Sequence, residues 1–252
     1  MIRYHGGPIT PMLVAMAMRG QHAMISHAAP QQLAQLAEIC QSFALDNGAF
    51  SVWKAGNTLD VPGYREWVEY WRWHPGFDWC LIPDSIDGTE ADNRRLMEDW
   101  LADDLRLNEQ SVPVWHLHES LERLEELAAM FPRVALGSSG EFKDPNAKCP
   151  RWRGRMNQAF QALCDEHGRP RVKVHGLRMM APTIFSLYPF ASVDSTNIAR
   201  NHGIDSYWDG VPYGRDVPRD TRAALMRDVC CQHPCAYVFR EKVEIQNELL
   251  FG

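Results

Sequence analysis

Short apolar runs alternate with longer amphipathic segments along most of the chain. Apolar runs bounded by Gly, Pro, Asn or Asp are typical of buried strands, and apolar residues at helical spacing are typical of helices that cover a sheet. The pattern predicts eight strands, at 2–5, 23–27, 43–46, 77–82, 112–117, 134–136, 172–175 and 191–193. It predicts helices at 30–42, 64–73, 90–105, 121–130, 151–165 and 219–230, a helical turn near 183–187 and another helix beginning near Asn197.

This alternation, over 252 residues, is what a (β/α)8 TIM-type barrel requires. We therefore predict an α/β fold with one barrel domain spanning residues 1–252, because no Pro/Gly/Ser-rich linker divides the chain. An open doubly wound sheet would show the same alternation, but no GxGxxG turn or P-loop marks its ligand crevice. The first βα unit, residues 1–29, is irregular because it lacks a clear full helix between its strands.

Polar residues stand at the ends of the predicted strands, where TIM-type barrels gather their active-site groups. These residues are Asp46, Asp84, His116, Gly137, Ser138, His175 and Asp194. Three carboxylates can divide the work at an N-glycosidic bond, because one can attack the sugar carbon while a second transfers a proton. A third can accept hydrogen bonds from the N–H edge of a purine, and backbone N–H groups of a Gly/Ser loop can receive its carbonyl oxygen.

Each strand-end acid also has a structural interpretation. Asp194, or one of its neighbours Ser195 and Thr196, can cap the helix that begins near Asn197. Asp46 precedes Asn-Gly and is a normal turn residue at that place. Asp84 can cap the next helix, with Asp87 as a rival for the functional role.

The histidines and aromatic residues have similar alternatives. His116 and His118 share one face of a strand, and either they or His175 can be buried structural histidines, as we expect of His5 and His27. The aromatic residues of segment 64–73 are expected to form core or the wall of a groove rather than a platform for stacked bases.

Composition and charge exclude several classes of protein. The chain is 45% hydrophobic and 23% charged, as ordinary globular proteins are, and its apolar segment 11–18 is too short to span a bilayer, so we expect a cytoplasmic protein. Seven scattered cysteines do not suggest a secreted disulfide framework. The net charge of −6 argues against nucleic-acid binding over the whole surface, and leaves local basic clusters at 151–155, 169–173 and 215–222.

Five segments carry most of the strand-end residues: LDNGAF (45–50), CLIPDSIDGT (80–89), VALGSSGEF (134–142), VKVHGLRMM (172–180) and SVDSTNIARN (192–201). In this order they resemble the DSGGF/Y motif, the base-recognition Asp strand, the Gly-rich base-contacting loop, the HLMG segment and the nucleophile motif of the tRNA-guanine transglycosylases. More closely, the chain resembles the short phage and bacterial relatives that insert 7-deazaguanine derivatives into DNA.

The resemblance implies a role for each matched position. Asp194 would attack C1′ of a guanosine or deoxyguanosine and release guanine, and Asp46 would deprotonate the incoming 7-deazaguanine. Asp84 would accept hydrogen bonds from the purine, and Gly137 and Ser138 would present backbone donors to its O6. Further positions are expected to contribute to binding. His116 stands where the family has Gln, and Phe50 would stack on the base. His175 and Gly176 belong to the HLMG-like segment, and Arg200 would hold the loop or a phosphate.

The resembled tRNA enzymes also hold a structural zinc through a CxCxxC group and a later His. The corresponding region here has Cys230, Cys231, His233 and Cys235, which departs from that pattern. Adjacent cysteines rarely both ligate one tetrahedral ion, so we expect neither zinc nor the zinc-bearing subdomain, and no other cofactor.

The expected partners are a nucleic acid, DNA rather than tRNA, a free 7-deazaguanine base, and a second copy or partner subunit; if the protein is phage-encoded, the compartment is the bacterial host cytoplasm. Two other functions stay open. One is a nucleoside or nucleotide N-glycosidase in which water replaces the 7-deazaguanine, and the other is a non-catalytic nucleic-acid-binding subunit of a modification complex.

Overall fold

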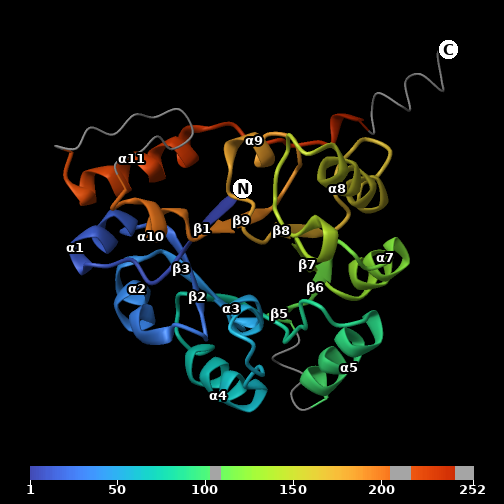
Figure 1. Ribbon diagram of the computed structural model, residues 1–252, viewed down its shortest axis with the longest axis horizontal. Helices are drawn as coiled ribbons and strands as arrows, with labels where there is room; N and C mark the ends of the chain where they lie inside the picture. Colours follow the sequence, from blue (N-terminus) through green and yellow to red (C-terminus); the bar gives the residue numbers. More distant parts are fainter. Residues whose placement is uncertain (103–108, 205–216, 242–252) are drawn as a thin grey trace. The chain divides into compact units, whose positions relative to one another are not determined.

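The computed structural model describes residues 1–102, 109–204 and 217–241 (Figure 1). It has the predicted α/β fold of the TIM-barrel type, with strands and helices alternating along the chain. The sheet order is β5-β4-β3-β2-β1-β9-β8-β7-β6. Neighbouring strands run parallel from β1 to β4, and they also run parallel from β6 to β9. The chain divides into two compact units, and β4 and β9 are the strands in which it passes from one to the other.

All eight predicted strands are present. The structure places them at β1 (Ile2–Gly6), β2 (His22–Ser26), β3 (Ser42–Asp46), β4 (Phe77–Leu81), β5 (Ser111–Val112) with β6 (Val114–His116), β7 (Arg133–Gly137), β8 (Lys173–Gly176) and β9 (Ser192–Ser195). The predicted strand 112–117 is interrupted at Pro113, which has no N–H to donate. The carbonyl of Pro113 still accepts the N–H of Ala135 at 2.9 Å, so the pairing with β7 continues across the break.

The first unit contains residues 2–80 and 194–233, and we call it the β1–β4 unit. Its helices are α1 (Met12–Ala15), η1 (Met16–Met18), η2 (Pro30–Gln32), α2 (Leu33–Ile39), α3 (Ala49–Lys54), α4 (Val61–Trp71), α10 (Asn197–Asn201) and α11 (Arg219–Gln232). Only the short α1 and η1 lie between β1 and β2, as the irregular first βα unit predicted. Helix α11 packs against both of them (Figure 1). The sequence pattern did not predict α3.

Tyr64 and Val68 of α4 are fully buried, whereas Tyr70 and Trp73 are exposed. The prediction that this aromatic segment forms core is therefore correct for one face of the helix only. Asp60 fixes the start of α4, because its side chain accepts the N–H of Gly63 at 3.0 Å.

The second unit contains Met1, residues 81–193 and residues from 234 onward, and we call it the β5–β8 unit. Its helices are α5 (Glu90–Leu101), α7 (Leu121–Met130), η3 (Gly140–Phe142), α8 (Pro150–Leu163) and α9 (Pro182–Phe185). The predicted end of the helix 90–105 falls partly outside the described residues. Thr89 and Asp92 form a capping box at the start of α5, and Ser120 caps α7, so both helices begin where local sequence signals place them.

Helices α7 and α8 pack against each other, and α7 also contacts β6 and β7 (Figure 1). Trp152 and Phe160 of α8 are buried in this part of the molecule together with Val134 and Leu136 of β7. This packing holds the ends of β6 and β7, which carry several of the predicted site residues.

Candidate functional site

In the β1–β4 unit, Asp194 lies inside β9 and is only 7% exposed. The N-cap residue of α10 is Thr196, whose side chain makes no capping hydrogen bond. The hydroxyl of Ser195 accepts the N–H of Asn197 at 3.0 Å instead. The structure thus assigns the helix-start contact to Ser195 and places Asp194 in the strand.

The end of β1 lies directly against the turn that follows Asp194. A Cβ atom added to Gly6 would lie 2.7 Å from Cγ2 and 3.2 Å from Cα of Thr196. Glycine permits this approach, because a Cβ atom only 2.7 Å from the methyl group of Thr196 would force Thr196 to shift. The turn after β9 is therefore held in place by β1 as well as by its own hydrogen bonds.

Asp46 is the last residue of β3 and is half-buried. Its Oδ1 accepts the N–H of Gly48 at 3.1 Å, and Gly48 has a φ of +84°, so the predicted turn at Asn47-Gly48 is formed. One oxygen of Asp46 therefore stabilises the turn, as the structural interpretation predicted. In the sheet order β3-β2-β1-β9, two strands separate Asp46 from Asp194.

Phe50 and Arg200 lie on helices of the same unit. The ring of Phe50 on α3 is half-buried, and its centroid is 5.8 Å from that of Trp53. Arg200 on α10 is exposed. Their predicted roles in stacking on a base and in holding a phosphate stay predictions.

In the β5–β8 unit, Asp84 and His116 form a buried pair. Nε2 of His116 lies 2.9 Å from Oδ2 of Asp84, and the two side chains are 1% and 8% exposed. Asp84 follows β4, and His116 is the last residue of β6. The fold thus brings together two of the predicted site residues, whereas Asp87, the rival of Asp84, is exposed.

The pair shifts the pKa of His116 in the direction opposite to that which burial alone would give. Burial by itself lowers the pKa of the imidazole, but the hydrogen bond to Asp84 and the negative charges of Asp84 and Glu119 outweigh burial and raise the pKa above its ordinary value. His116 therefore holds its second proton more firmly than an ordinary histidine does, and in that protonated form both ring nitrogens are hydrogen-bond donors.

Glu119 and Asn93 complete this cluster, and the sequence analysis missed both. Oε2 of Glu119 accepts the backbone N–H of His116 at 2.8 Å, and Oε1 accepts Nδ2 of Asn93 at 3.0 Å. Glu119 is an acid between a strand and a helix, just as Asp84 is, so the criterion that selected Asp84 could also have found it. Asn93 is a helix residue that no local signal distinguishes.

Gly137 is the last residue of β7 and lies beside this cluster, and Ser138 follows it in the chain. A Cβ atom on Gly137 would lie 3.3 Å from Nδ1 of His116, so the absence of a side chain leaves the ring edge uncovered by residue 137. The hydroxyl of Ser138 accepts Nε1 of Trp152 at 3.1 Å, and its carbonyl accepts Nη2 of Arg178 at 3.3 Å. These contacts fix the loop whose backbone N–H groups, as the resemblance implies, would donate to O6 of a bound purine.

His118 is exposed and makes contacts with the loops around this cluster. Its Nδ1 lies 2.7 Å from the hydroxyl of Ser139, and its Nε2 lies 3.3 Å from the carbonyl of Gly88. The ring stacks on that of His116, with centroids 5.7 Å apart. His118 therefore connects the loops after β4, β6 and β7.

His175 and Gly176 lie at the end of β8. Nδ1 of His175 is 2.9 Å from the hydroxyl of Ser192, which also accepts Nη1 of Arg133 at 2.9 Å. A Cβ atom on Gly176 would lie 2.9 Å from Cε1 of Phe190 and 3.0 Å from Cβ of Met179. These contacts support a structural contribution from both residues, and their predicted role in binding stays a prediction.

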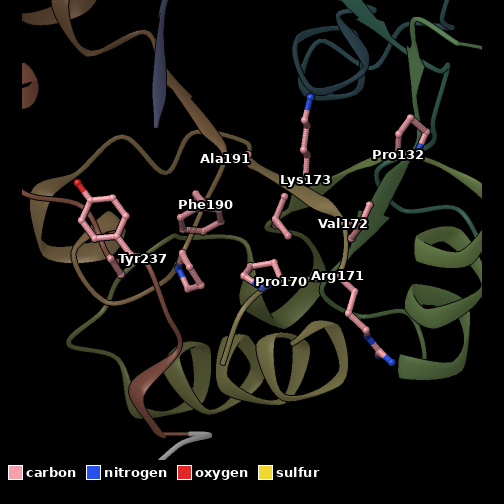
Figure 2. Close-up of a pocket in the computed structure, with 11 residues that line it drawn as sticks. Pro132, Pro170, Arg171, Val172, Lys173, Phe190, Ala191 and Tyr237 are labelled. Carbon is pink, nitrogen blue, oxygen red and sulfur yellow. The ribbon is translucent and has the colours of Figure 1, made fainter. Parts of the chain in front are cut away.

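A pocket of about 500 Å3 lies elsewhere in the β5–β8 unit (Figure 2). Its lining includes Pro132, Lys173 and Ala191, which lie at or just before the starts of β7, β8 and β9. In Figure 2 the side chains of Arg171 and Lys173 point in different directions. None of the predicted site residues lines this pocket, which is at the amino ends of the strands.

The candidate zinc ligands show no assembled metal site. Cys230 is buried, Cys231 is exposed, Cys235 is half-buried, and none of the three forms a disulfide. Within residues 1–102, 109–204 and 217–241, no group of three or more His, Cys, Asp or Glu residues is arranged to hold a metal ion. In the same ranges, no helix is both long and apolar enough to cross a membrane.

No protein-family model matches the chain, and neither curated proteins nor solved structures give a significant match.

Proposed function

We propose that the protein is a base-exchange transglycosylase that replaces guanine in a polynucleotide, DNA in preference to tRNA, with a 7-deazaguanine derivative. The observation that carries the proposal is the buried Asp84–His116 pair beside Gly137, at strand ends of a TIM-type fold. A carboxylate, an imidazole and a residue without a side chain suit a flat heterocycle that presents both N–H donors and acceptor atoms.

In the first proposed step a carboxylate oxygen of Asp194 attacks C1′ of the target nucleotide. The C1′–N9 bond breaks, its electron pair leaves with guanine, and N9 takes up a proton from the solvent. The sugar is then joined to Asp194 by an ester bond. The burial of Asp194 in β9 supports this role, because it restricts the access of water to the ester.

In the second proposed step the exchange runs in reverse with a different base. Asp46 removes the proton from the ring nitrogen of a 7-deazaguanine, and that nitrogen attacks C1′ while the ester bond to Asp194 breaks. Asp84 accepts hydrogen bonds from the N–H edge of the base, and backbone donors of Gly137 and Ser138 receive its oxygen. Phe50 stacks on the base.

The polynucleotide must deliver its base to these groups unpaired, because C1′ of a stacked base pair is not accessible to a carboxylate. The basic segment 151–155 gives limited help. Arg151 pairs with Glu141, Arg153 pairs with Glu241 at 3.0 Å, and Arg155 donates to the carbonyls of Leu117 and Glu119. We therefore propose that a second copy or a partner subunit supplies much of the positive charge that DNA requires.

The test is an exchange assay. The protein is incubated with radiolabelled 7-deazaguanine and either duplex DNA, single-stranded DNA or tRNA, and the label that enters the polymer is counted. We expect incorporation into DNA, a covalent adduct on denaturation, and a loss on the order of a thousandfold or more for Asp194→Asn. Asp144→Asn, at an exposed position, is the matched control.

The other functions give different results in the same assay. Release of guanine without incorporation of label would identify an N-glycosidase. Binding of DNA without release of guanine, unchanged in Asp194→Ala, would identify a non-catalytic subunit. An adduct that persists in Asp194→Asn would remove Asp194 from the role of nucleophile.

A further inference from the structure

The pocket in Figure 2 lies wholly within the β5–β8 unit and has an apolar floor. Val172, Val174 and Phe190 line it and are buried. Its volume of about 500 Å3 falls within the range of ligand-binding sites. It lies at the amino ends of β7, β8 and β9, whereas Asp84 and His116 lie at the carboxyl ends of their strands. A molecule bound in the pocket therefore leaves the candidate site open.

The rim of the pocket carries an aromatic side chain that the core does not use. Tyr237 is 83% exposed, although it lines the same pocket as the buried Phe190. Tyrosine carries much of the binding energy of many protein interfaces, because its ring offers a large contact area at a small entropic cost. An exposed aromatic ring beside an apolar floor is therefore typical of a binding surface.

Two cations line the pocket without an acidic partner. Nη2 of Arg171 donates to a backbone carbonyl, which holds the guanidinium in place but leaves its charge uncompensated, and Lys173 is exposed. Among the residues that the structure describes, neither cation forms an ion pair and no acidic side chain lines the pocket. Arg151 and Arg153, in contrast, are each paired with a glutamate. The basic cluster at 169–173 is therefore available to an anionic ligand, although the net charge of the protein is −6.

The walls of the pocket are held in place by the fold itself. The segment that carries Tyr237 is tied on both sides. The N–H of Ala236 donates to the carbonyl of Phe185 at 3.2 Å, and the N–H of Phe239 donates to the carbonyl of Gly168 at 2.7 Å. Three prolines, whose rings restrict the backbone, also belong to the lining: Pro132, Pro170 and Pro189. A preformed site of this kind loses less conformational entropy on binding than a flexible one does.

The lining indicates a ligand with an apolar centre and two separate anionic groups. The side chains of Arg171 and Lys173 point in different directions (Figure 2), so a single carboxylate or phosphate cannot face both. A short peptide can present an apolar side chain with a carboxylate on either side of it. A polynucleotide fits less well, because its affinity comes from many phosphate contacts and two cations supply few of them. An acidic peptide is therefore the occupant that the floor and the charges favour.

We propose that this pocket binds a short acidic segment of a partner protein. An apolar side chain of the segment packs on the floor, against Val174 and Phe190. Acidic residues on either side of it face Arg171 and Lys173, and the ring of Tyr237 packs on the segment from the rim. The proposal does not depend on the proposed function, because the pocket shares no residue with the candidate site.

The first test measures the binding of labelled synthetic peptides to the full chain by fluorescence anisotropy. Each peptide has Leu or Phe at its centre and one Glu on either side, and the set covers every spacing from adjacent residues to three residues away. Each peptide has a counterpart with Gln in place of Glu and another with Gly at the centre. The set therefore separates the contribution of the charges from that of the apolar side chain.

At low salt, we expect the best acidic peptide to bind about five- to thirtyfold more tightly than its Gln counterpart, as for two exposed ion pairs. This ratio should fall as salt is added, because salt screens exposed charges. The Gly-centred counterpart should bind more weakly than the parent peptide. The proposal is wrong if no acidic peptide binds more tightly than its Gln counterpart, or if the Gly-centred peptides bind equally well.

Charge reversal locates the site and separates loss of binding from loss of the fold. In the double variant Arg171→Glu with Lys173→Glu, we expect the preference to reverse, so that a peptide with Lys in place of Glu binds more tightly than the acidic one. An unfolded protein would bind neither peptide. Arg169→Glu is the matched control, because Arg169 is exposed in the same basic cluster but does not line the pocket. An unchanged preference in the double variant would overturn the proposal.

A variant of the rim and a competing polymer complete the test. We expect Tyr237→Ser to weaken the best acidic peptide by about fivefold, whereas Tyr70→Ser, at a similarly exposed tyrosine of the β1–β4 unit, leaves its affinity unchanged. Equal affinities of the Tyr237→Ser variant and the parent protein would overturn the role of Tyr237. A single-stranded oligonucleotide should not displace the peptide. Displacement would show that the pocket takes phosphates, and would overturn the choice of an acidic peptide as the occupant.

Discussion

Two buried histidines near strand ends, one in each unit, have pKa values that are shifted in opposite directions. His5 of β1 is 2% exposed, and burial, reinforced by the positive charges of Arg227, His22 and Arg3, lowers its pKa to about 3. His116 of β6 is 1% exposed, and the carboxylates of Asp84 and Glu119 overcome the effect of burial and raise its pKa. Burial alone therefore does not determine the protonation of a histidine in this fold.

The difference separates a structural histidine from a functional candidate. A neutral imidazole among cations gains nothing from its second proton, and we expected a structural role for His5 from the sequence. A histidine whose ring contacts one buried carboxylate and whose backbone N–H contacts another is costly to assemble, because three ionisable groups lose contact with water. A buried histidine whose pKa is shifted by specific charge partners is characteristic of functional sites, which favours the β5–β8 unit as the place where a ligand is recognised.

The largest effect is expected from a substitution that lowers the pKa of His116, as the pKa of His5 is lowered. Asp84→Asn removes the charge that stabilises the imidazolium, and we expect the pKa of His116 to fall below its ordinary value. The free energy of unfolding should decrease by about 3 kcal/mol, the lower end for a broken buried ion pair, because the imidazole can release its proton. Urea denaturation at pH 7 measures the change. Asp87→Asn at the exposed neighbour should cost less than about 0.5 kcal/mol, and equal losses for the two variants would show that the buried pair contributes nothing.

A smaller effect is expected when acid is used to protonate His5. Its folded-state pKa lies below the unfolded value of about 6.5, so its contribution to stability is complete above pH 6.5 and is lost as the pH falls toward 3. The loss is about 1.4 kcal/mol per pH unit, or roughly 2 to 3 kcal/mol by pH 4.5. We expect His5→Gln to flatten the stability curve between pH 6.5 and 4.5, whereas His167→Gln at an exposed position leaves the slope unchanged. Parallel curves for His5→Gln and the parent protein would mean that His5 is already protonated in the folded state.

The smallest effect is expected at the alkaline side, where His116 should behave in the opposite sense. Its folded-state pKa is raised, so its contribution to stability is complete below pH 6.5 and is lost as the pH rises through the folded-state value. The amount lost is about 1.5 kcal/mol, as for a weak hydrogen bond to a charged group. Melting temperatures of the parent protein and of His116→Gln between pH 6 and 9 measure it, and the two curves should converge as the pH rises. A constant difference across this range would contradict a protonated His116.

Most of the fold could be predicted because its signals are local. Every predicted strand is present, and α7 begins and ends at the predicted residues because Ser120 caps it and its apolar positions repeat at helical spacing. The split at Pro113 was missed although proline was visible, because β-branched neighbours outweighed it in the pattern. Helix α3 was missed because its residues follow Asn-Gly, and the turn signal masked the helix that starts directly behind it.

The candidate site was only partly predictable. Asp84 and His116 were selected as strand-end residues, but that they contact each other is decided by the adjacency of their strand ends, which no local pattern records. Asn93 was missed for the same reason, whereas Glu119 stands between a strand and a helix as Asp84 does and could have been selected by the same criterion. The local pattern at Asp194 favoured a helix cap formed by it, Ser195 or Thr196, and the structure places Asp194 inside β9, with Ser195 making the contact to the start of α10.

The sequence by itself determined the alternation of strands and helices, and with it the TIM-type fold, because side-chain periodicity, capping residues and turn residues act over a few neighbouring positions. Only the tertiary structure decided which polar groups meet and what charge they carry. The pKa of a buried group depends on charges brought within a few ångströms by residues distant along the chain. His5 and His116 are both buried at strand ends, and it is the fold that places cations near one and carboxylates against the other.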